Sequence, residues 1–98
     1  MRIKSYTQLP AYEINGNFLN VYWDEQSFQD EETGEQGWSY LMCRAYTTDS
    51  YDSLVVKIIR SQYSIDDEFA SINDGGERHA EFLAFRDQAK ALAAGRFA

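Results

Sequence analysis

Two helix-capping signatures constrain the fold of the second half of this chain more than any other feature. Asp49 and Ser50 can each accept a hydrogen bond from the free amides of a first helical turn, and Ser64 starts a second signature that continues with Asp66 and Asp67. After the first cap, apolar residues recur every three or four positions and form one arc of a helix: Tyr51, Leu54, Val55, Ile58 and Ile59. The pattern predicts two consecutive helices.

The second helix is predicted to be short, with Ile65, Phe69 and Ile72 as its apolar residues, and to end near residues 73–76. A third helix is predicted from Glu77 to about Ala94. It has apolar residues at three- and four-residue spacing and a ridge of alanines, and Gly95 stands where a left-handed residue would terminate it.

The first half has the alternation of extended structure. Asn15-Gly16 favours a tight type I′ hairpin, followed by a return strand over residues 18–23 with Leu19, Val21 and Trp23 on one face. Residues 38–47 predict a further strand. Between them, residues 24–37 are acidic and rich in turn residues, and we expect an exposed loop or a long hairpin tip there.

Strands followed by helices indicate an α+β domain. We expect an N-terminal antiparallel hairpin or three-stranded meander followed by three helices packed on it. With 98 residues the chain is long enough for a single domain over 1–98, in which 1–47 is mainly β, with the acidic loop at 24–37, and 50–94 is mainly α.

The net charge and the hydropathy of the chain restrict the expected partners and the expected location. A net charge of −7 disfavours direct binding to nucleic-acid phosphates or to anionic lipid, so neither nucleic acid nor membrane is an expected partner. No apolar run is long enough to cross a bilayer, and the N-terminus lacks the apolar segment of a secretory signal. We expect a soluble protein that stays in the cytoplasm.

The residues that usually carry out chemistry are scarce. His79 and Cys43 are single copies, and the spacing His79-Ala80-Glu81 resembles zinc deaminases but lacks the pair of cysteines those enzymes need afterwards. Asp74, Glu77, His79 and Glu81 could form a metal site or simply a solvated helix start, and the carboxylates of 66–68 could act as general acid and base or as a helix cap. The simpler interpretation is favoured in both cases. We expect no catalytic residue, no metal and no cofactor.

Aromatic residues on the predicted strands are the better candidates for a binding site. Such side chains combine a large contact area with a polar tip and are enriched in interface cores, although half of them or more could be intramolecular core. The candidate partner-binding residues are Phe18, Tyr22, Trp38, Tyr40 and Tyr46. The acidic stretch from Asp24 to Glu35 could alternatively imitate a row of phosphates, against which Gly34 and Gly37 suggest mobility.

One stretch of sequence resembles a known group of proteins. The run Tyr51-Asp52-x-Leu54-Val55-Val56-Lys57-Ile58-Ile59-Arg60-x-x-Tyr63-Ser64-Ile65-Asp66-Asp67-Glu68, followed by Ala70, Ile72-Asn73 and an acidic-aromatic helix, resembles small uncharacterised proteins encoded by phages and prophage-like elements of gut bacteria, mainly over residues 51–92. Asn15-Gly16 and Trp23-Asp24-Glu25 look similar to the first half of such proteins. The resemblance implies a role in virion assembly, in tail or head morphogenesis or in manipulating a host protein, and it supplies no catalytic residue.

Together these observations predict a non-enzymatic phage-type structural or assembly protein that acts through protein contacts. We expect a homo-oligomer that uses the aromatic face of its sheet, in the cytoplasm of a bacterial host or associated with a virion. The alternative is an acidic inhibitor or DNA mimic acting on a host nucleic-acid-binding protein. A small enzyme is ranked last, because the candidate residues form no complete set.

Overall fold

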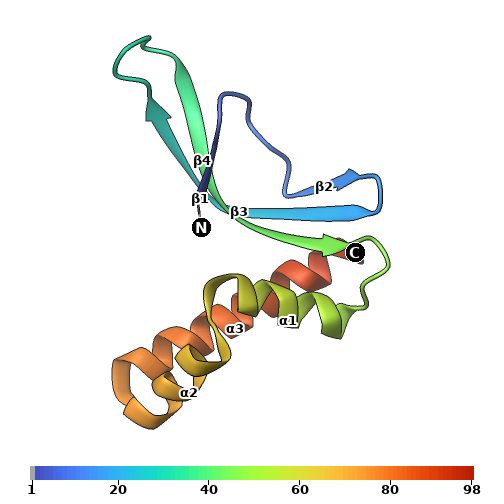
Figure 1. The fold of residues 1–98 in the computed structure, drawn as a ribbon, viewed down its shortest axis with the longest axis vertical. Helices are drawn as coiled ribbons and strands as arrows, with labels where there is room; N and C mark the ends of the chain where they lie inside the picture. The colour runs from blue at the N-terminus through green and yellow to red at the C-terminus, as the bar shows by residue number, and fades with distance from the viewer. Residues whose placement is uncertain (1) are drawn as a thin grey trace. The chain divides into compact units, whose positions relative to one another are not determined.

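The computed structural model describes residues 2–98, which fall into two compact units. The first runs up to Thr47 and contains the strands, and the second, Thr48–Ala98, contains the helices (Figure 1). The chain is therefore an α+β protein, with an antiparallel sheet first and three helices after it in the described residues. This fold class confirms the prediction, and the boundary lies where the apolar spacing changes from alternation to helical periodicity.

The sheet has four antiparallel strands in the order β1-β4-β3-β2. Their bounds are β1 Arg2–Ser5, β2 Tyr12–Asn15, β3 Phe18–Gln29 and β4 Gln36–Tyr46. This is one strand more than the predicted three-stranded meander. The additional strand, β1, pairs with β4, so the segment before β2 crosses to the opposite edge of the sheet.

The predicted hairpin at Asn15-Gly16 joins β2 to β3, but its turn lies one residue later. Asn15 pairs with Phe18, which leaves Gly16 and Asn17 as the two-residue loop. Gly16 has a φ of 63°. Asn17 does not have a positive φ, because Asp24 is the only non-glycine residue with positive φ among residues 2–98. A positive φ at the first loop residue alone is the pattern of a type II′ turn, in place of the predicted type I′.

Of the two predictions for residues 24–37, the exposed loop is wrong and the long hairpin tip is confirmed. Residues 24–29 belong to β3 and residues 36 and 37 to β4, so the strands form a long hairpin with a turn at 30–35. Acidic residues are compatible with these strands because most of their side chains are exposed. The hairpin is closed by Phe28, which pairs with Gly37, and by Gln29, which pairs with Gln36.

A β-bulge interrupts the long hairpin at its middle. Trp23 pairs with Leu41 and Gln26 pairs with Ser39, so Asp24 and Glu25 together face the single residue Tyr40. Figure 1 shows the β3–β4 hairpin turning a corner here, with β1 beside one arm and β2 beside the other. The bulge therefore bends the sheet and divides it into two arms.

The two faces of the sheet differ as the alternation predicts. On the arm next to β2, Leu19 pairs with Ala45 and Val21 with Cys43, and all four side chains are buried. On the opposite face of the same strands, Phe18 pairs with Tyr46 and Asn20 with Arg44. The register thus confirms that Leu19, Val21 and Trp23 share a face that excludes Phe18.

The helices are α1 Tyr51–Gln62, α2 Ile65–Asp74 and α3 Gly76–Arg96. Of the two candidate caps before α1, Ser50 is used: its hydroxyl accepts a hydrogen bond from Ser53 N–H. At α2 a complete capping box forms, in which the Ser64 hydroxyl accepts from Asp67 N–H and the Asp67 carboxylate accepts from Ser64 N–H. Gly95 does not end α3, which continues to Arg96.

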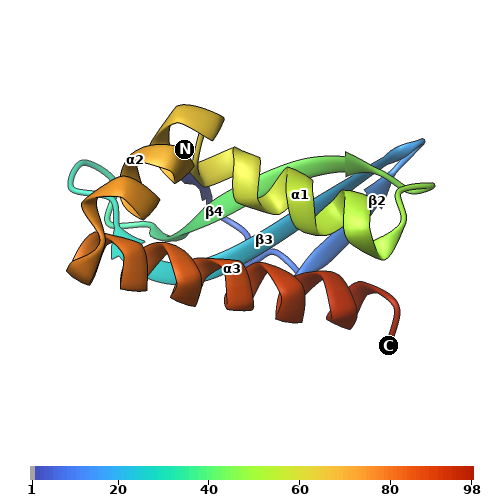
Figure 2. The same ribbon diagram turned by 90° about the horizontal axis from the view of Figure 1, so that it is seen from below.

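Within the helical unit, α1 and α3 run side by side and contact each other, and α2 contacts α3 (Figure 2). Tyr63, between α1 and α2, lies against two rings of α3, with centroid distances of 5.2 Å to Phe82 and 5.5 Å to Phe85. The buried apolar residues of the unit are Leu54, Val55, Ile58, Ile59, Phe82, Ala89 and Ala93. The apolar arc predicted for the first helix is therefore buried, apart from Tyr51, which is exposed.

Candidate functional site

The five aromatic residues proposed as a partner-binding surface differ in exposure. Phe18 is 40% exposed and Tyr46 is 52% exposed, whereas Tyr22 and Tyr40 are buried. Trp38 is half-buried on the other arm of the sheet, where it pairs with Ser27 and Ser5. The five residues therefore do not form one continuous exposed surface, and Phe18 and Tyr46 are the pair most available to a partner.

Phe18 and Tyr46 form a cross-strand stack on which a cation also lies. Their ring centroids are 5.5 Å apart with an interplanar angle of 27°, and the guanidinium of Arg44 lies 5.2 Å from the centre of the Phe18 ring. Arg44 is held in place because its Nε–H donates to Asn20 Oδ1 at 3.2 Å. We call Phe18, Arg44 and Tyr46 the aromatic patch.

Tyr22 uses its hydroxyl within the protein. It donates to Glu13 Oε1 at 3.0 Å, and burial, with Glu13 adding to it, raises the pKa of Tyr22. Its ring lies edge-on to that of Tyr40 at 5.9 Å. The position therefore supports the sheet and ties β2 to β3.

Tyr40 connects the bulge to the loop between β1 and β2. Its hydroxyl donates to Glu25 Oε1 at 2.7 Å and accepts from Leu9 N–H at 2.9 Å, while the Gln8 amide donates to both oxygens of Glu25 at 3.0 and 3.1 Å. The hydrogen bonds from Tyr40 and then Gln8 lower the pKa of Glu25. A pocket of about 270 Å³ lies between this loop and the bulge, lined by Leu9, Pro10, Ala11, Tyr22, Trp23, Asp24, Glu25 and Tyr40.

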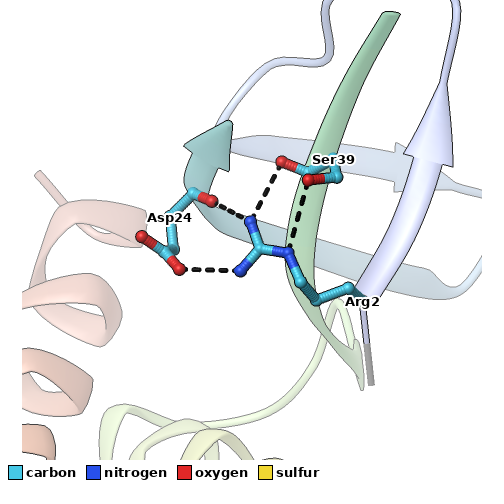
Figure 3. Close-up of polar contacts among 3 residues, drawn as sticks. All are labelled: Arg2, Asp24 and Ser39. Atoms are coloured by element: carbon cyan, nitrogen blue, oxygen red, sulfur yellow. Dashed lines mark hydrogen bonds and ion pairs between the residues drawn. The ribbon is translucent and has the colours of Figure 1, made fainter. Parts of the chain in front are cut away.

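Arg2 secures the same bulge from the other side, as Figure 3 shows. Its Nη1 donates to Asp24 Oδ2 at 2.7 Å and its Nη2 donates to the main-chain carbonyl of Asp24. The guanidinium also donates to Ser39, from Nε to the hydroxyl and from Nη2 to the carbonyl, each at 3.3 Å. One side chain of β1 thus holds β3 and β4 together where Asp24 adopts its positive φ of 55°.

A second pocket, of about 400 Å³, lies on the arm next to β1 and includes Lys4, Tyr6, Gln26, Phe28, Asp30 and Ser39. Two of its charged groups, Lys4 and Asp30, already have partners. Lys4 Nζ lies 5.3 Å from the centre of the Phe28 ring, and Tyr6 donates to Asp30 Oδ2 at 3.0 Å, a bond that raises the pKa of Tyr6. The arrangement stabilises the end of the hairpin.

The acidic turn at 30–35 is closed by hydrogen bonds of Asp30. Asp30 Oδ1 accepts from the N–H groups of Glu32 and Thr33 at 2.8 and 2.9 Å, and the main chain closes with Asp30 N–H donating to Glu35 O at 2.9 Å. The hydrogen bonds that the Asp30 carboxylate accepts from Thr33 N–H, from the Tyr6 hydroxyl and from Glu32 N–H lower the pKa of Asp30. Of the two glycines that suggest mobility in the sequence, Gly34 lies in the turn and Gly37 is a buried strand residue covered by the Phe28 ring.

The residues considered as candidates for catalysis do not come together in one site. Cys43 is buried in β4, and His79 is half-buried in the first turns of α3 while Glu81 is exposed. Asp67 belongs to the capping box of α2 and Glu68 pairs with Arg60 at 3.2 Å. Over residues 2–98, no three His, Cys, Asp or Glu side chains are grouped so that they could hold a metal ion.

An apolar stripe on α2 is the feature that the sequence did not assign. Ile65, Phe69 and Ile72 are 56%, 57% and 50% exposed, and the residue that α2 buries is Ser71. The apolar spacing predicts the helix correctly. It does not predict which face is buried, because the face that turns inward consists of small residues such as Ala70 and Ser71. We call Ile65, Phe69 and Ile72 the α2 stripe.

The chain matches no protein-family model, no curated protein and no solved structure. Among the described residues, no helix is long and apolar enough to cross a membrane.

Proposed function

We propose that this protein is a non-enzymatic structural or assembly protein of phage type, which acts through protein contacts and self-associates through its aromatic patch. The single observation that supports the proposal best is the exposed stack of Phe18 and Tyr46 with Arg44 lying over it. The resemblance of residues 51–92 to phage and prophage proteins suggests the setting. Such a protein would work in the cytoplasm of a bacterial host or on a virion.

The chemistry of the patch favours contact with protein. Aromatic residues and arginine are enriched in the energetically dominant positions of protein interfaces. A second copy offers the same three side chains, so that rings could stack on rings around a twofold axis, the commonest symmetry of soluble oligomers. Because Arg44 is fixed by Asn20, little side-chain entropy would be lost when it is covered.

Sedimentation equilibrium of the whole chain over a range of concentrations tests this proposal. Tyr46→Ser and Phe18→Ser should weaken self-association by about tenfold or more each, which is the loss of about 1.4 kcal/mol. Tyr51→Ser is the matched control, because Tyr51 is as exposed as Phe18 but belongs to α1. A wild-type chain that stays monomeric at all concentrations, or equal effects of all three substitutions, would contradict the proposal.

The acidic turn supports a second candidate, an inhibitor that binds the basic surface of a host nucleic-acid-binding protein. Glu31, Glu32 and Glu35 are exposed on a turn that the hydrogen bonds of Asp30 hold in one shape, as a mimic of phosphates requires. Their joint change to glutamine should release a partner captured from host lysate. The control for net charge is a second triple variant at exposed positions of α3, Glu77→Gln, Glu81→Gln and Asp87→Asn. Equal release by both triple variants would remove the candidate.

A further inference from the structure

We propose that the α2 stripe is a second docking surface, and that its partner is a cationic amphipathic helix of another protein. The inference goes beyond the proposed function, because the surface lies on the helical unit and its partner is neither a copy of this chain nor a ligand of the aromatic patch.

The stripe has the geometry of a helix-docking face. Ile65, Phe69 and Ile72 are spaced by four and three residues, so that their side chains lie on one side of α2 over two turns. Ser71 lies on the opposite side and is fully buried. The same spacing of anchors is the one by which amphipathic helices bind protein surfaces.

The charges of α2 select a cationic partner. Its sequence from Ile65 to Asp74 contains four carboxylates and no lysine, arginine or histidine. Glu68 pairs with Arg60 at 3.2 Å and Asp74 with Arg78 at 2.7 Å. The Asp67 carboxylate is used in the capping box with Ser64, which leaves Asp66 to set the charge beside the first turn. Asp66 borders Ile65 and Phe69 on one side, so a helix lying on the stripe would meet negative charge along that border.

The same charges argue against the other occupants of an apolar face. A second copy docked on the stripe would bring an equally acidic helix against this one, in a chain whose net charge is already −7. An anionic lipid surface would be repelled for the same reason. A helix with apolar anchors and lysine or arginine at its borders satisfies both the stripe and its rim.

Fluorescence anisotropy with the full chain and two labelled synthetic helices provides the test. The first helix has leucines at the spacing of the stripe and lysines at the bordering positions, and the second has glutamates in place of the lysines. We expect the lysine peptide to bind, to bind more weakly as salt rises, and to bind at least about tenfold more tightly than the glutamate peptide.

Variants of the chain locate the binding. Phe69→Ser and, separately, Ile72→Ser should each weaken the binding of the lysine peptide by about tenfold. Val56→Ser is the matched control, since Val56 is equally exposed but lies on α1, and it should leave binding unchanged. Asp66→Asn should weaken the lysine peptide and not the glutamate peptide. Circular dichroism of each variant would show that its helices are retained.

Four results would overturn the inference. These are no binding of the lysine peptide, equal binding of both peptides, unchanged binding by both serine variants, and self-association that is lost in Phe69→Ser but kept in Tyr46→Ser. The last result would assign the stripe to a second copy. Because the peptide assay does not involve the aromatic patch, its failure and the failure of the proposed function can be told apart.

Discussion

Arg2 and Asp24 meet at the corner of the sheet, where one guanidinium donates to both the carboxylate and the main-chain carbonyl of Asp24 (Figure 3). The contact joins residues that are 22 positions apart and holds the edge strand β1 against the bulge. Since Asp24 has positive φ, a conformation that costs free energy for a residue with a Cβ, the fork of Arg2 helps to fix a corner that the strand would not adopt by itself.

Replacing Arg2 with lysine should therefore lower the free energy of unfolding by about 0.5–1 kcal/mol, although the charge is kept. The lysine ammonium cannot reach the carboxylate, the carbonyl and Ser39 in one plane. Urea unfolding followed by tryptophan fluorescence would measure the change, with Arg86→Lys on α3, an exposed position, as the control. Equal unfolding midpoints for the wild type and Arg2→Lys would contradict this role.

Gly37→Ala should destabilise the hairpin arm by about 1–3 kcal/mol, the usual range for an added methyl group in a packed site. A Cβ at Gly37 would lie 2.8 Å from Cε1 of Phe28 and would overlap Cζ of the same ring. The double variant Phe28→Leu/Gly37→Ala should lose less than the sum of the two single variants, because the smaller side chain makes room. Strictly additive losses in urea unfolding would argue against the contact.

Tyr40→Phe should raise the pKa of Glu25 and lower the urea midpoint. The substitution removes the hydroxyl that donates to Glu25 and accepts from Leu9 N–H, and the Tyr40 bond is the main reason for the low pKa of Glu25. NMR titration of the Glu25 carboxyl carbon in both proteins measures the shift. Tyr51→Phe, an exposed tyrosine of α1, should leave that titration unchanged.

Ser64→Ala should destabilise α2 by about 1 kcal/mol through loss of the capping box. Ser53→Ala, at an exposed position inside α1, is the control. Amide hydrogen exchange of residues 65–74 would show whether the effect is confined to α2.

The cap also makes a prediction for pH. Hydrogen bonds from the hydroxyl and the N–H of Ser64 lower the pKa of Asp67 in the folded chain. Because the pKa of Asp67 is lower in the folded chain than in the unfolded chain, the ionised carboxylate stabilises the fold at pH values above the unfolded pKa. This stabilisation is lost as the pH falls through the folded pKa. Melting temperatures of the wild type should therefore fall on acidification in the range where Asp67 titrates, and Ser64→Ala should fall less. Parallel curves for the two proteins would contradict this linkage.

The helices were predictable because their signals are local. Ser64 and Asp67 specify a start within four residues, and the apolar arc of α1 needs only its own spacing. The end of α3 was wrong because Gly95 can adopt helical dihedrals as well as the left-handed ones that a terminator needs, so that glycine alone does not stop a helix.

The sheet was predicted less completely, since its decisive contacts join distant residues. Nothing near Arg2 indicates that β1 pairs with β4, and the bulge depends on the bonds that Tyr40 and Arg2 make to Asp24 and Glu25. In the sequence Gly37 suggests only a mobile position, and the structure adds that its missing side chain lets Phe28 cover the strand. Tyr22 and Tyr40 could not be separated from Phe18 and Tyr46 by sequence, because alternation gives the face and not the exposure.

The bulge also inverts the parity of β3. Before it, the odd positions Leu19, Val21 and Trp23 share the face of Leu41, and after it the even positions Gln26 and Phe28 share the face of Ser39 and Gly37. If Asp24 and Glu25 were both paired in regular alternation instead, every later residue of β3 would move to the opposite face, and Phe28 would turn away from Gly37. The bulge at these two acidic residues thus keeps both halves of β3 in register with β4.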